Sequence, residues 1–210
     1  MIERVLPLVV RIEREDPPTR ADAIEGAARA VLHMLVTEEP GWAEAVAEWD
    51  GYRIRKVVRR ARGIQWRRAE ELPGITIAQG TATVRVYPPI GLDEWPPDLA
   101  KLQVGGTDLV DPEPLPQPAD GLPLILLNPA IEMTAGKAMA QAGHAAQLGY
   151  RAASPAVRRR WQDTGFALAA RVAGPRQWAA ALAGGAPVVQ DAGFTEVAPG
   201  SCTAAAVLPR

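Results

Sequence analysis

Residues 122–127 read LPLILL and residues 133–146 read MTAGKAMAQAGHAA, and these two stretches decide the fold that we predict for the chain. The first is a short apolar run with the length of a buried β-strand. The second is rich in alanine, the residue with the highest helix propensity, and Thr134 has a side chain suited to cap the N-terminus of a helix. The order strand, turn, helix is typical of an α/β unit.

Three polar side chains share one face of the predicted helix. Lys137, Gln141 and His144 occur at i, i+4 and i+7, and most of their neighbours are Ala or Gly. Near a helix N-terminus, behind a strand, such a row is suited to bind a polar or anionic ligand. The alternative is a packing helix with a solvated lysine and a core histidine.

A second stretch, VVQDAGFTEVAPGSCTAAAV at residues 188–207, predicts a strand, a turn-rich segment and another strand. Together the stretches resemble the type 2 peptidyl-tRNA hydrolase family, with its motifs M-x-x-G-K-x-x-A-Q-x-x-H-A and D-A-G-x-T-x-x-x-P-G-[TS]-x-T. The resemblance covers residues 122–209. The matching positions are Met133, Gly136, Lys137, Ala140, Gln141, His144 and Ala145, then Asp191, Ala192, Gly193, Thr195, Pro199, Gly200, Ser201 and Thr203.

The resemblance implies metal-independent hydrolysis, without a cofactor, of the ester that joins a peptide to the terminal ribose of tRNA. Such a reaction needs a positioned water, a proton acceptor and a group that stabilises the oxyanion. Asp191 is the candidate to orient or deprotonate the water, with help from Thr195, and Lys137 is the candidate to neutralise an oxyanion or a phosphate. His144 and Gln141 complete the predicted catalytic set, and Gly136, Ser201 and Thr203 are predicted to bind substrate.

The composition excludes several other classes of protein. The 210 residues have a formal net charge of −1 and a single cysteine, Cys202, which rules out an internal disulfide and a cysteine-based zinc site. No apolar run approaches the roughly 20 residues that span a bilayer, and the N-terminus does not resemble a signal peptide, so we expect a cytoplasmic protein that does not act at a membrane. The chain lacks a complete phosphate-binding loop and a G-x-S-x-G elbow.

Charge is unevenly spread along the chain. Residues 1–118 carry 15 Lys and Arg against 19 Asp and Glu, yet residues 53–68 hold a dense basic run. A solvated strand or helix face explains such a run in an arbitrary protein. If the protein handles tRNA, the run is as well explained by a phosphate-binding surface, and we assign Arg55, Arg59 and Arg60 to it.

The two halves of the chain repeat one pattern. PLVVR at residues 7–11 echoes PLILL at residues 123–127, each is followed by an Ala-rich helix, and Trp49 and Trp66 are spaced as Trp161 and Trp178 are. We therefore predict an α/β fold of two pseudo-repeated three-layer α/β/α units, each with a small mixed sheet of about four strands flanked by helices. The predicted boundaries are residues 1–88, a Pro-rich extended linker at 89–120, and residues 121–210.

The first unit lacks the motifs of the second, and residues 79–80 leave no room for a segment like 191–199. The family is usually described as homodimeric, so the chain resembles such a dimer fused into one polypeptide with one degenerate copy, and we expect a monomer.

Three departures from the family pattern support a second hypothesis. Ala135 stands where a further lysine is common, Phe194 where arginine is common, and Asn128 at a position that is often charged. The alternative is therefore a non-catalytic relative that binds RNA or protein. The hydrolase hypothesis expects Lys137 and Asp191 close together at an accessible cleft, whereas the binding hypothesis expects one of them in a buried structural ion pair.

Overall fold

Two mixed β-sheets with the same strand order form the framework of the protein. The computed structural model describes residues 3–191, 193 and 197–209. The first sheet has the order β2-β1-β4-β3 and the second β7-β6-β9-β8. The first strand pair of each sheet, β1–β2 and β6–β7, is parallel, and the remaining pairs are antiparallel. The strands are β1 (Arg4–Arg11), β2 (Lys56–Ala61), β3 (Ile75–Gln79), β4 (Ala82–Val86), β6 (Leu124–Leu127), β7 (Ala169–Val172), β8 (Val188–Gln190) and β9 (Cys202–Val207), and the short β5 (Ile90–Gly91) adds to β1. The predicted fold class is confirmed.

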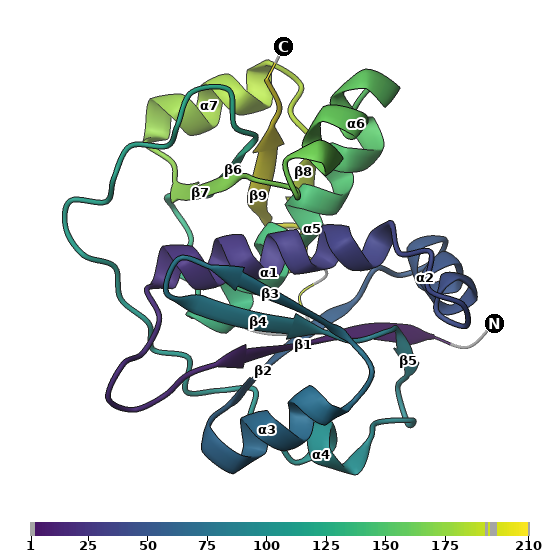
Figure 1. The fold of residues 1–210 in the computed structure, drawn as a ribbon. Coiled ribbons are helices and arrows are strands. Elements are labelled where there is room, and N and C mark those ends of the chain that lie inside the picture. The colour runs from purple at the N-terminus through teal and green to yellow at the C-terminus, as the bar shows by residue number, and fades with distance from the viewer. Residues whose placement is uncertain (1–2, 192, 194–196, 210) are drawn as a thin grey trace.

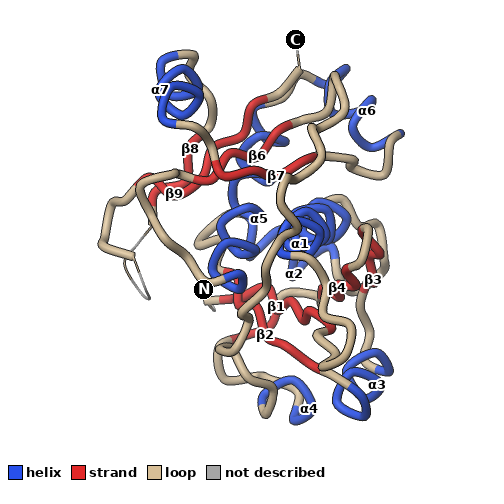
Figure 2. The backbone as a smooth tube through the Cα atoms, turned by 90° about the vertical axis from the view of Figure 1, so that its left-hand side faces the viewer, coloured by secondary structure: helices blue, strands red, loops and turns tan. Residues whose placement is uncertain are grey.

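The helices form layers around these sheets (Figure 1). The two long helices, α1 (Arg20–Leu35) and α5 (Ala135–Ala152), lie between the sheets. The helices α3 (Gly63–Glu71) and α4 (Pro97–Ala100) cover the outer face of the first sheet, and α7 (Pro175–Ala183) lies over the outer face of the second sheet. The remaining helices, α2 (Ala43–Asp50) and α6 (Pro155–Asp163), follow the long helices. Figure 2 shows the same sandwich after a 90° rotation, with α1 and α5 between the sheets.

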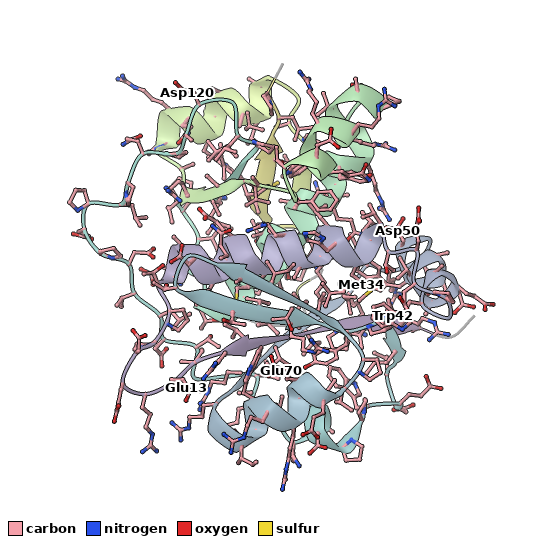
Figure 3. All side chains as sticks on the ribbon, viewed as in Figure 1. Glu13, Met34, Trp42, Asp50, Glu70 and Asp120 are labelled. Carbon is pink, nitrogen blue, oxygen red and sulfur yellow. The ribbon has the colours of Figure 1, made fainter. Side chains whose placement is uncertain are left out.

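The two units share one hydrophobic core. Buried side chains from both sheets and from α1 and α5 form one cluster, and Figure 3 shows side chains filling the space between the long helices and both sheets. A Cβ built on Gly143 of α5 would lie 2.8 Å from Cγ2 of Val31 in α1, so glycine is what allows this close helix approach. Val172 at the end of β7 and Val207 at the end of β9 lie outside this core and are 60% and 36% exposed.

The long helices begin in the same way and then diverge. Thr19 caps α1 and Thr134 caps α5, each through its side-chain oxygen. Counting from these caps, the positions of Lys137, Gln141 and His144 in α5 are filled in α1 by Asp22, Gly26 and Arg29. Asp22 accepts a hydrogen bond from the Thr81 backbone at 2.8 Å, and Arg29 donates to the Gly165 carbonyl at 3.0–3.1 Å. These residues of α1 therefore make contacts within the fold.

The proline-rich segment after β5 is built into the fold and does more than span the surface. Leu99 and Leu102 are 1% and 3% exposed and complete a second apolar cluster on the outer face of the first sheet. Further along, the Thr107 hydroxyl accepts a hydrogen bond from the Gly136 backbone at 2.9 Å, and the Asp111 carboxylate accepts one from Ala21 at 2.6 Å. The segment therefore holds the first turns of both long helices. Across the described part of the chain, no helix is long and apolar enough to cross a membrane.

Candidate active site

A cleft of about 570 Å³ opens between the two units. One wall is formed by residues 52–58 of the first unit, which lead into and begin β2. The opposite wall is formed by the first three turns of α5 and by residues 189–191 at the end of β8. Val104, in the segment that connects the units, also lines the cleft. Although the motifs all lie in the second half of the sequence, both halves build this cavity.

Lys137 and Asp191 meet in this cleft. Lys137 stands in the first turn of α5 and Asp191 directly follows β8, and Nζ lies 2.6 Å from Oδ2. Their side chains are 10% and 7% exposed, and both line the cavity. The two side chains are close together at the cleft, as the hydrolase hypothesis expects. They also form a largely buried ion pair, as the binding hypothesis expects.

Further donors hold the Asp191 carboxylate. Gln141 Nε2 donates to Oδ2 at 2.8 Å, and the Gly193 backbone donates to Oδ1 at 2.8 Å. Gly193 has φ +79°, and a Cβ there would meet Pro199 at 2.3 Å, so this turn requires glycine. Burial by itself would raise the pKa of Asp191, but the hydrogen bonds from Lys137, Gly193 and Gln141 and the charge of Lys137 outweigh it, and the pKa lies below its usual value.

Thr203 and Ser201 act behind this cluster. The Thr203 hydroxyl, which is fully buried, donates to Gln141 Oε1 at 2.5 Å, so the amide group of Gln141 is turned toward Asp191. The Ser201 carbonyl accepts a hydrogen bond from the Asp191 backbone at 2.9 Å. Both residues, predicted to bind substrate, are placed where they position Asp191 and Gln141.

Backbone N–H groups in the first turn of α5 donate hydrogen bonds to side chains of the protein. The Gly136 N–H donates to Thr107 and the Lys137 N–H donates to Thr134, at 2.9 and 3.3 Å. These two backbone donors are already paired, which leaves the Lys137 side chain as the cationic group that this turn presents. Thr195, the remaining residue of the predicted catalytic set, lies outside the described residues, as does Phe194.

His144 faces a residue that the sequence analysis did not single out. Lys56, the first residue of β2, places Nζ 3.1 Å from His144 Nδ1 across the boundary between the units. Burial, followed by the charges of Lys56 and Lys137, lowers the pKa of His144 well below its ordinary value, so the imidazole is neutral at pH 7. Lys56 was treated only as one member of the basic run. The sequence feature that could have singled it out is its residue type, because lysine is rare among the 23 basic residues of the chain, with three in all. Two of the three, Lys56 and Lys137, line this cleft.

The basic run separates into groups with different surroundings. Arg53 and Arg55 line the cleft, and each has Nη1 within 3.5 Å of the Glu3 carboxylate. Arg59 donates to the Ala100 and Leu102 carbonyls at 3.0 and 2.5 Å, and Arg60 donates to the Gly105 carbonyl at 2.9 Å. Of the three arginines predicted to bind substrate, the structure brings Arg55 to the cleft, while Arg59 and Arg60 bind the connecting segment.

Two of the departures from the family pattern have structural explanations. Ala135 is 1% exposed and belongs to the shared hydrophobic core, where a lysine side chain would be buried among apolar groups. Asn128 donates to the Cys202 carbonyl at 2.8 Å and accepts from the Ala130 backbone at 2.9 Å. Its amide therefore closes the end of β6 against β9, where a charged residue would lack this pairing.

The protein is a mixed α/β structure with a cleft in which three polar side chains meet. The lysine and the amide come from a helix, and the carboxylate follows the end of a strand. Residues 124–210 match the family model of peptidyl-tRNA hydrolase PTH2, the family that the two motifs resemble. The recognition made from the two motifs is confirmed. No solved structure matches the chain. Among residues 3–191, 193 and 197–209, no group of three or more His, Cys, Asp or Glu side chains is arranged to hold a metal ion.

The lowered pKa of His144 predicts a pH-dependent stability. The folded protein favours the neutral imidazole, whereas the unfolded chain binds a proton at this residue below pH about 6.5. The free energy of unfolding should therefore fall as the pH drops below that value, by at most about 1.4 kcal/mol per pH unit from this group, and this loss should be absent at higher pH. Urea unfolding at pH 7.5, 6 and 5 measures it. The variant His144→Gln should show a smaller decrease, whereas an equal decrease would assign the effect to other groups.

Proposed function

We propose that the protein hydrolyses the ester bond of peptidyl-tRNA and releases free tRNA and a peptide, without a metal ion, in the cleft between the units. The observation that carries the proposal is the contact of Lys137 and Gln141 with the Asp191 carboxylate inside this cleft, in the part of the chain that matches the peptidyl-tRNA hydrolase family. All three side chains come from motif positions, and each reaches the cavity.

Asp191 prepares the attacking water in the proposed reaction. Its lowered pKa keeps the carboxylate ionised at neutral pH, and Lys137, Gln141 and Gly193 hold it in one orientation. A water bound to the carboxylate attacks the ester carbonyl carbon and gives its proton to Asp191 as the new C–O bond forms. When the tetrahedral intermediate breaks down, the ribose oxygen leaves with that proton, and the carboxylic acid of the released peptide then loses its own proton to solvent.

Lys137 stabilises the negative charge that develops on the carbonyl oxygen. Its ammonium group lies at the site of reaction in a largely buried position, where an opposite charge is stabilised more strongly than in bulk water. As the Asp191 carboxylate takes up the proton of the water, its hold on Lys137 weakens and the ammonium can turn to the oxyanion. The ion pair seen in the structure is the ground state of this exchange.

The basic residues at the edge of the cleft supply affinity for the tRNA backbone. Arg53 and Arg55 are 53% and 35% exposed in their side chains, and their present partner Glu3 is 25% exposed. A phosphate group can compete for these guanidinium groups, because arginine binds phosphate in two-point contacts. Binding should weaken as salt is added, which is typical of phosphate contacts.

The proposed role of the first unit is that of a degenerate copy. Residues 1–88 keep the sheet order and the central helix of the catalytic unit at residues 121–210, while Asp22, Gly26 and Arg29 replace its polar row. Residues 89–120 join the units and hold α5. In this proposal one chain reproduces the arrangement of a dimer and acts as a monomer.

Isotope labelling tests the proposed reaction. In water enriched in ¹⁸O, the wild-type protein should release an N-blocked amino acid from its tRNA with one ¹⁸O in the carboxylate and leave the terminal adenosine of the tRNA intact. The isosteric variant Asp191→Asn should lower the rate by about 10²–10⁴-fold, the range for loss of a general base. Cleavage of the RNA chain, or equal rates for both proteins, would contradict the assignment.

A second candidate function is binding of RNA or protein without turnover. The observation that favours it is the low exposure of the Lys137–Asp191 pair, 10% and 7%, which is typical of a structural ion pair. In that case Asp191→Asn should lower stability, and the wild-type protein should bind tRNA without releasing the blocked amino acid.

A further inference from the structure

Lys56 is a buried lysine of the first unit whose side chain contacts the second unit. It stands at the start of β2, is 9% exposed and lines the cleft. Its Nζ has three acceptors within hydrogen-bond distance, namely the Ile54 carbonyl at 3.1 Å, Gln147 Oε1 at 2.6 Å and His144 Nδ1 at 3.1 Å. Two of these partners lie on α5, in the unit that carries the motifs.

The number of acceptors matches the ammonium form of Lys56. An ammonium group has three N–H bonds and no lone pair, and each N–H finds one acceptor here. The ring of Trp49 lies 4.7 Å from Nζ and adds an interaction that requires a cation. Burial lowers the pKa of Lys56 well below its usual value, the charge of Arg151 lowers it further, and the charge of Asp50 acts in the opposite direction.

This contact determines where His144 carries its proton. If Lys56 donates to Nδ1, that nitrogen must offer a lone pair, so the single proton of the neutral imidazole lies on Nε2. Among the described residues Nε2 has no hydrogen-bond partner, and His144 lines the cleft. An N–H donor is therefore left for a bound substrate.

We propose that Lys56 is a positioning residue that the first unit supplies to the active site, holding His144 as a neutral donor whose Nε2–H binds an oxygen of the substrate. The inference rests on the proposed function for the identity of that substrate. It also separates the roles of the cleft residues, because a histidine protonated on Nε2 cannot accept a proton there. Asp191 remains the acceptor for the proton of the water.

A network across the boundary between the units keeps Lys56 in place. The fully buried Gln147 accepts from Lys56 and donates to Asp50 Oδ1, and Arg151 also pairs with Asp50. Asp50 is the last residue of α2, on the right-hand side of the view in Figure 3. The first unit therefore contributes Lys56 to the site. It also contributes the Asp50 carboxylate, which orients the Gln147 side chain that accepts from Lys56.

NMR spectroscopy of the imidazole nitrogens tests the inference without reference to activity. The chain has two histidines, and the variant His33→Gln assigns their signals. In the wild-type protein at pH 7, His144 should be protonated on Nε2 and not on Nδ1. A proton on Nδ1 would overturn the inference, since Lys56 would then be the acceptor.

The variant Lys56→Met keeps most of the side chain and removes the donor. The preference of His144 for Nε2–H should weaken, and its pKa should rise because burial and the charge of Lys137 still lower it but the charge of Lys56 is gone. We expect kcat to fall by about 10–100-fold with little change in KM. The control Lys101→Met removes an exposed lysine that pairs with Asp98, and it should leave all three quantities unchanged.

The outcomes distinguish the inference from the proposed function. An unchanged tautomer and pKa in folded Lys56→Met would overturn the inference, even if the wild-type protein is an active hydrolase. The expected NMR changes without hydrolysis by any protein would overturn the proposed function and leave His144 as a donor in a binding site. The tautomer of the wild-type protein provides the test if Lys56→Met does not fold.

Discussion

The variant Lys137→Ala is expected to hydrolyse peptidyl-tRNA about 10²–10³-fold more slowly than the wild-type protein, the usual effect of removing a group that stabilises an oxyanion. It should also be less stable, by up to about 3 kcal/mol, because Asp191 stays buried without its cationic partner. Among the residues that the structure describes, Gln141 and Gly193 still donate to the Asp191 carboxylate, which limits the loss. The free energy of unfolding and the rate of peptide release are measured on the same preparation.

The double variant Lys137→Ala/Asp191→Ala separates the catalytic role of the pair from its structural role. Removing both charges leaves no unpaired carboxylate, so its stability should recover relative to Lys137→Ala. Its activity should not recover, because both reacting groups are gone. A double variant that regains turnover together with stability would show that the pair supports the fold only.

A leucine at residue 143 is expected to disrupt the joint between the two units. The Cβ position of Gly143 is 2.8 Å from Val31 Cγ2 and 3.3 Å from Lys56 Cδ, so a larger side chain must push α1 and α5 apart. Overpacking a dense core costs roughly 1–3 kcal/mol and occasionally more, and we expect Gly143→Leu at or above the upper end, since both units share this core. Activity should also fall, because the same displacement moves Lys56 away from His144.

Two further variants make this experiment specific. Ala152→Leu places the same residue at an exposed position of the same helix and should change the free energy of unfolding by less than about 0.5 kcal/mol. Val31→Ala removes the methyl group that collides, so the pair Gly143→Leu/Val31→Ala should cost less than the sum of its single changes. Strict additivity would mean that the helices do not meet at this point.

The sequence predicted the framework because each local pattern agreed with the fold. LPLILL contains β6, the Ala-rich stretch forms α5 with Thr134 as its cap, and the matched order of elements corresponds to two sheets of equal topology. Patterns that depend on tertiary contacts were harder to predict. Helices α2 and α6 are short and bury few residues, so their sequences contain few apolar positions from which a helix can be predicted. The helix α4 formed within a segment that its prolines made appear extended.

The motifs predicted the part of the site that lies in the second half of the chain. They identified Lys137, Gln141, Asp191 and His144, all of which line one cleft. The contribution of Lys56 depends on how β2 of one unit faces α5 of the other, and local patterns do not encode that relation. For the same reason the basic run gave no indication that Arg59 and Arg60 turn toward the connecting segment.

The most direct test of the central claim is the release of an N-blocked amino acid from purified tRNA by the wild-type protein, measured beside Lys137→Ala and Asp191→Asn, with Lys101→Met as the charge control. We predict turnover by the wild-type protein and Lys101→Met, and a loss of at least about 10²-fold in the two site variants. Wild-type protein that is folded and binds tRNA in a salt-dependent way, yet releases nothing, would contradict the account and favour a binding protein.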